Sequence, residues 1–212
     1  MEGFVQERSP RLERLAHGIS TVLHPFFIPL YALCLLLFTP TLYSFLSLTT
    51  KLYLLGVLLL YTMALPTLSL LFLRHLGRLS SYRIDDRRER ILPLMLGTVC
   101  YLLCALTLLK FPVAQLLHKM MFGAALCQLF CLVVTLWWKI SLHLTALGGA
   151  TAFFVLLAVA GVGDMLLPLI GIVLCSGLLA SARLWLGCHT ATQILAGYAG
   201  GFLIMSSVVL FL

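Results

Sequence analysis

The sequence predicts an all-α integral membrane protein, a bundle of six to seven transmembrane helices. Of its 212 residues, 62% are hydrophobic and only 10% are charged, whereas about a quarter of the residues in a soluble domain are charged. Apolar runs recur along the chain, each close to the ~20 residues that span a bilayer. Short polar turns separate these runs, and no repeat or linker divides the chain. We therefore expect a single domain over residues 1–212.

Residues 1–23 are predicted to form an N-terminal interfacial segment, with its helix over 9–23. The first 18 residues are too polar for the apolar core of a cleavable signal peptide, so none is expected. Ser9 can cap a helix and Pro10 suits its first turn. The apolar residues that follow recur at helical spacing, with charged residues beside them, as in helices that lie at a membrane surface. They are Leu12, Leu15, Ile19 and Val22.

Seven apolar segments follow, and we expect each to cross the membrane. The first, about 25–46, begins after His24-Pro25 and contains Thr39-Pro40, which kinks the helix or ends it early. If this first hairpin is re-entrant, six spans are left. The others are expected over 52–73, 91–109, 116–138, 141–160, 165–186 and 190–212.

Counting the crossings predicts that the N-terminus and the segments 74–90, 139–143 and 183–190 share one membrane face. The opposite face carries three cations, and the shared face carries the other eleven of the 14 Lys and Arg residues. Cytoplasmic loops are enriched in Lys and Arg. We therefore expect a multi-pass protein of the cell (inner) membrane with this shared face in the cytoplasm.

The most informative motif follows the sixth apolar segment, where Arg183, His189 and Gln193 are spaced as R-x5-H-x3-Q. Gly187 is expected to end one helix, and Thr190 or Thr192 to cap the next. His189 would then lie beside a helix N-terminus, which attracts anions. This spacing resembles the third signature of the type 2 phosphatidic acid phosphatase superfamily, integral-membrane lipid phosphatases related to vanadium haloperoxidases.

Two weaker matches accompany this resemblance. The family's second signature, P-S-G-H, is matched by the Ser and His of the run K-I-S-L-H at 139–143. The first signature, K-x6-R-P, is similar to Arg83 and Arg90, which have six residues between them, with Pro93 three places later. Arginine replaces lysine at the first position, which keeps the charge and changes the geometry.

The resemblance implies a metal-independent phosphatase that hydrolyses a membrane lipid phosphate or diphosphate through a phosphohistidine, with no cofactor. It makes His189 the nucleophile and His143 the general acid and base. Gln193 stands where the family has an Asp that orients the nucleophile, so we expect a slow enzyme that Gln193→Asp speeds or leaves unchanged. The residues expected to bind the phosphate are Arg83, Arg90, Arg183, Ser141 and Lys139.

Two other functions are compatible with parts of the sequence. A catalytically weak or inactive protein that binds a lipid phosphate, as a carrier or partner subunit, would explain the Gln at position 193. A Mg²⁺-dependent prenyltransferase would use Asp85, Asp86 and Glu89, but such enzymes need two acidic clusters and no second cluster exists. Nucleic acid is excluded as a partner because the cations lie between spans without an aromatic platform.

Overall fold

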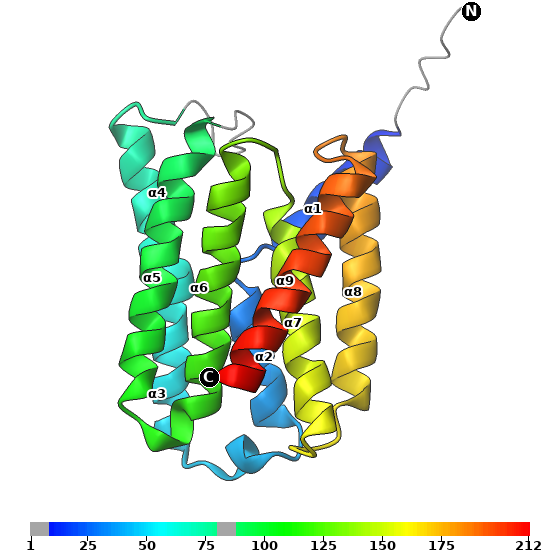
Figure 1. Ribbon diagram of the computed structural model, residues 1–212. Coiled ribbons are helices and arrows are strands. Elements are labelled where there is room, and N and C mark those ends of the chain that lie inside the picture. The colour runs from blue at the N-terminus through cyan, green and yellow to red at the C-terminus, as the bar shows by residue number, and fades with distance from the viewer. Residues whose placement is uncertain (1–8, 80–87) are drawn as a thin grey trace, which may run out of the picture.

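The structure is a computed structural model that describes residues 9–79 and 88–212. Its helices stand side by side, and the turns that connect them lie at the two ends of the bundle (Figure 1). In the described part of the chain, six helices are long and apolar enough to cross a membrane. The prediction of an all-helical, multi-pass membrane protein is therefore confirmed.

The helix boundaries lie within a few residues of the predicted ones for five of the six spans, and the remaining span is longer than expected. It runs without a break over Leu48–His75 and combines α3 (Leu48–Leu58), a π-helical segment (Leu59–Ala64) and α4 (Leu65–His75). The other five are α5 (Ile91–Leu109), α6 (Gln115–Thr135), α7 (Leu142–Val159), α8 (Leu166–Trp185) and α9 (Ala191–Phe211).

The predicted first span over 25–46 is wrong in its length. The helix found there, α2, covers only Ile28–Phe38, about 16 Å at 1.5 Å per residue, roughly half of a bilayer core. It ends before Pro40, whose ring restricts the preceding residue to an extended conformation. Figure 1 shows that α1 (Pro10–Val22) and α2 together carry the chain from one end of the bundle to the other.

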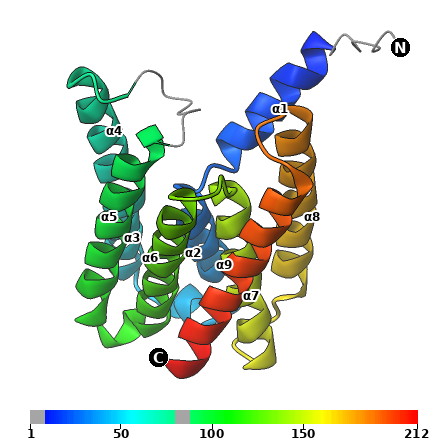
Figure 2. The same cartoon turned by 45° about the horizontal axis from the view of Figure 1, so that its top comes forward.

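The first helix is amphipathic, as predicted, and it packs on α8. Ala16 and Ser20 are buried on its inner side, whereas Leu12, Leu15 and Val22 are exposed, as contact with lipid would require. Ser9 occupies the N-cap position, but its side chain makes no capping hydrogen bond, so this detail of the prediction is wrong. Figure 2 shows that α1 crosses the end of α8 obliquely.

Glycines bring the backbones of α7 and α9 into direct contact. A Cβ on Gly148 would collide with the backbone carbonyl of Tyr198, and one on Gly201 with that of Thr145. Because neither glycine has a side chain, the two backbones touch, as in other membrane helix pairs built on small residues. This contact fixes the N-terminal ends of α7 and α9 next to each other.

Candidate functional site

A polar cavity of about 530 Å³ lies at the end of the bundle where α7 and α9 begin. Its wall includes side chains of α1, α4, α5, α6 and α7 and the turn between α8 and α9. Four of the residues predicted from the motifs line this one cavity: Arg90, His143, Arg183 and His189. They come from three separate parts of the chain, so the fold brings the three motif regions together.

The two arginines reach the cavity from helix ends. Arg90 is the N-cap residue of α5 and is half-buried. Arg183 lies in the last turn of α8, where its charge complements the negative end of the helix dipole. The helix then ends at Gly187, whose φ of 65° any other residue would adopt at a cost. The N–H of Cys188 donates to the carbonyl of Arg183, which closes a Schellman motif.

His189 is buried and follows this turn directly. Its Nδ1 lies 3.2 Å from Oε1 of Gln193, and the same oxygen accepts the N–H of Thr190 at 3.1 Å. A backbone N–H can only donate, so the oxygen of the Gln193 amide is held toward both groups. It follows that Nδ1 of His189 carries a proton and donates it to Gln193. The other nitrogen, Nε2, keeps its lone pair.

The environment keeps the imidazole of His189 neutral. Burial lowers its pKa from 6.5 to about 3, and the positive charges of Arg183, Arg90 and Lys139 contribute to this decrease. The hydrogen bond with Gln193 opposes the shift but does not reverse it. At neutral pH, His189 is therefore a neutral imidazole with cationic side chains nearby.

His143, the second residue of α7, faces the same cavity. Its Nε2 lies 3.2 Å from the backbone carbonyl of Ser20 in α1. Since a carbonyl can only accept, Nε2 carries a proton and Nδ1 is the nitrogen that can exchange protons with a ligand. The contact joins α1 to α7, so the amphipathic first helix forms part of the wall of the site.

The other predicted site residues differ in their placement. Gln193 does not line the cavity but is hydrogen-bonded to His189, which does. Lys139 lies close enough to lower the pKa of His189 but is not on the cavity wall. Ser141 is fully buried beside the cavity, and its carbonyl packs against Gly197 of α9. Arg83 lies outside the described residues, as do Asp85 and Asp86, two of the three acids considered for Mg²⁺ binding; the third, Glu89, lies in the short 3-10 helix Arg88–Arg90 before α5.

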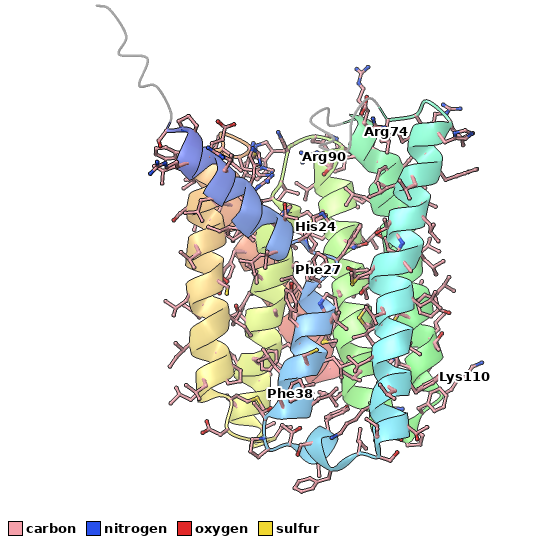
Figure 3. All side chains as sticks on the ribbon, turned by 180° about the vertical axis from the view of Figure 1, so that it is seen from behind. His24, Phe27, Phe38, Arg74, Arg90 and Lys110 are labelled. Atoms are coloured by element: carbon pink, nitrogen blue, oxygen red, sulfur yellow. The ribbon has the colours of Figure 1, made fainter. Side chains whose placement is uncertain are left out.

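Among the polar residues that line this cavity and that sequence reasoning did not assign to the site are His24 and Gln128. His24 lies in the non-helical segment between α1 and α2, below Arg90 and deeper in the bundle (Figure 3). Gln128 is a buried amide in the middle of α6. Each had a signal in the sequence, because a His-Pro pair stands at the start of the first apolar segment and a lone Gln occurs inside another.

Comparisons of the chain with protein-family models, with curated proteins and with solved structures found no match.

Proposed function

We propose that this protein is a membrane lipid phosphatase that forms a phosphohistidine at His189 and needs no metal ion. The observation that carries the proposal is the state of His189. Its Nδ1 proton is fixed by Gln193, so its Nε2 lone pair is available at a cavity that also contains Arg90, Arg183 and His143. A neutral imidazole beside two guanidinium groups suits attack on phosphorus.

The cavity has the charge needed to hold a phosphate group. The guanidinium groups of Arg90 and Arg183 can each give two N–H donors to phosphate oxygens. The N-terminus of α9 adds the positive end of a helix dipole beside His189. This arrangement supplies the positive charge that phosphoryl transfer requires on the equatorial oxygens. Arg83 is part of the proposed set through the motif alone.

In the first step, Nε2 of His189 attacks phosphorus in line with the ester oxygen of the lipid. The N–P bond forms as the P–O bond to the lipid breaks. The departing oxygen takes a proton from Nδ1 of His143, which enters this step doubly protonated beside the bound phosphate anion, with its Nε2–H donated to Ser20. In the second step, a water molecule gives a proton to His143 and attacks phosphorus. The N–P bond breaks, inorganic phosphate leaves, and both histidines return to their first state.

A lipid, rather than a soluble phosphate ester, is favoured by what lies below the polar cavity. A second, apolar pocket of about 40 Å³ shares Gln128 and Leu142 with it. This pocket is lined by side chains such as Ile28 and Phe153, in the core of the bundle. This pocket is too small for an acyl chain, so only the first carbons beyond a phosphate in the polar cavity would meet its apolar side chains.

We place the site at the cytoplasmic side of the cell membrane. Lys51 and Lys110 lie at the end of the bundle opposite Arg74 and Arg90 (Figure 3 labels Lys110, Arg74 and Arg90). The positive-inside rule assigns the end with more Lys and Arg to the cytoplasm.

The direct test measures phosphate release by the purified protein in detergent, with a chelator present, from a panel of lipids. The panel contains phosphatidic acid, phosphatidylglycerophosphate, undecaprenyl diphosphate and lipid A phosphate. We expect the wild type to hydrolyse at least one of them and His189→Ala to release none. His75→Ala, which removes an exposed histidine of α4, is the matched control and should keep full activity. Equal release by the wild type and His189→Ala would contradict the proposal.

A second function, binding of a lipid phosphate without hydrolysis, is favoured by the neutral side chain of Gln193. A neutral acceptor fixes the tautomer of His189 but stabilises a phosphohistidine less than a carboxylate would. Binding-only function predicts that a lipid from the panel binds tightly and that no phosphate is released during prolonged incubation. The same panel therefore separates the two functions.

A further inference from the structure

We propose that His24 is a substrate-binding residue of this site, and that its Nε2–H donates a hydrogen bond to an oxygen of the bound phosphate. The inference rests on the proposed phosphatase function and adds to it a residue that lies outside the three motif regions. It is carried by the geometry of the non-helical segment between α1 and α2.

The tautomer of His24 follows from its backbone contact. The N–H of Phe26 donates to Nδ1 of His24 at 3.3 Å, so Nδ1 must present its lone pair. Burial, with a contribution from the charge of Arg183, lowers the pKa of His24 from 6.5 to about 4, which keeps the ring neutral at pH 7. A neutral ring that accepts at Nδ1 carries its proton on Nε2. His24 is therefore a hydrogen-bond donor at this nitrogen.

The donor lies where a phosphate is expected. His24 lines the cavity that Arg90, His143, Arg183 and His189 also line. Its ring lies edge-on to that of His143, with 5.2 Å between the centroids. Among the residues that the structure describes, His24 has no hydrogen-bond partner at Nε2, so this N–H is available to a ligand in the cavity.

Hydrogen bonds hold the non-helical segment that carries His24 in place. The N–H of Phe27 donates to the carbonyl of His24 at 2.9 Å, and the hydroxyl of Tyr101 in α5 donates to the carbonyl of Pro25 at 3.3 Å. Non-helical backbone inside a membrane bundle is tolerated where it lines a polar cavity. The break between α1 and α2 thus places a neutral donor between the cations and the core.

Three substitutions separate the donor from the shape of the ring. His24→Phe keeps the aromatic contact with His143 and removes both nitrogens. His24→Gln places an amide N–H near the position of Nε2, and His24→Asn places an amide oxygen near Nδ1 but no donor in the cavity. Removal of a hydrogen bond to a charged oxygen should lower kcat/KM about 10- to 100-fold. We expect this loss for Phe and Asn, and recovery of most of it for Gln.

The experiment measures kcat/KM for release of phosphate from the panel lipid that the wild type hydrolyses fastest and the Kd of inorganic vanadate, each for the wild type and the three variants. Thermal unfolding in detergent checks that each variant is folded. His24→Phe with wild-type kcat/KM and wild-type vanadate affinity would overturn the inference, and so would equal values for Asn and Gln. If the wild type releases no phosphate from any lipid of the panel, the proposed function fails, whereas weaker vanadate binding by Phe and Asn than by Gln still supports the role of His24.

Discussion

The hydrogen bond between Gln193 and His189 gives the sharpest quantitative prediction of the proposed mechanism. When Nε2 of His189 bonds to phosphorus, the ring keeps its proton on Nδ1 and becomes positively charged. In this protein the group next to that proton is a neutral amide oxygen at 3.2 Å. Gln193→Glu replaces it with a carboxylate of the same length, whereas Gln193→Asp is one methylene shorter and should act in the same direction more weakly. Gln193→Leu removes the acceptor.

The expected magnitudes follow from hydrogen-bond energies. A hydrogen bond to a charged partner contributes about 1.5–3 kcal/mol, and a neutral one about 0.5–1.5 kcal/mol. The carboxylate should therefore stabilise the charged intermediate by about 1 kcal/mol more, which raises kcat about 5-fold. Removing the acceptor costs at least the neutral bond and frees the tautomer, so Gln193→Leu should lower kcat about 10- to 100-fold.

The assay measures steady-state phosphate release in detergent micelles from the panel lipid that the wild type hydrolyses fastest. Gln193 also belongs to a capping box with Thr190, so its replacement weakens the start of α9. Thr190→Ala controls for this, because it removes the cap's hydroxyl and leaves the bond between His189 and Gln193 in place. It should destabilise the protein by about 1 kcal/mol and change kcat less than 2-fold. A slower enzyme with Glu, or wild-type kcat with Leu, would refute the reasoning.

Three further predictions concern the fold. Gly201→Ala forces α7 and α9 apart and should lower the melting temperature and the activity, with a loss of about 1–3 kcal/mol in the free energy of unfolding. Gly171 has open space around it, so Gly171→Ala should lower neither. The pKa values of His24 and His189 lie below 6.5 in the folded protein, so the unfolded chain binds more protons at low pH. The free energy of unfolding should therefore be highest above about pH 6.5 and fall toward pH 4, less steeply in His24→Gln. A free energy of unfolding that does not change with pH would contradict this. A reporter fused after Leu212 should be external, and a cytoplasmic signal would reverse the orientation.

The apolar pattern of the sequence predicts most of this fold because each span must satisfy its own backbone in lipid. Gly187 and the capping pair Thr190 and Gln193 mark the turn between α8 and α9, so its position could be read in advance. The length of α2 could not be, since hydropathy continues past Pro40 although the helix does not. The contribution of α1 to the site depends on its packing against α8 and α7, which no local pattern records.

The site itself was predictable only where residues match a motif. Arg90, His143, Arg183 and His189 do, and the fold brings them to one cavity. His24 precedes His143 by more than a hundred positions, and only the tertiary structure shows their contact. The orientation of the Gln193 amide was undetermined in the sequence, because an amide can accept or donate. The backbone N–H of Thr190 settles it in the structure.

The central claim, a phosphorylated His189, is tested most directly by trapping the intermediate. The purified protein is mixed with a lipid that carries radioactive phosphorus, denatured at alkaline pH during turnover, and digested for mass spectrometry. The proposed mechanism predicts an acid-labile label on the peptide that contains His189, and no label in His189→Ala. Phosphate release without any label on the wild-type protein, or a label on another residue, would contradict it.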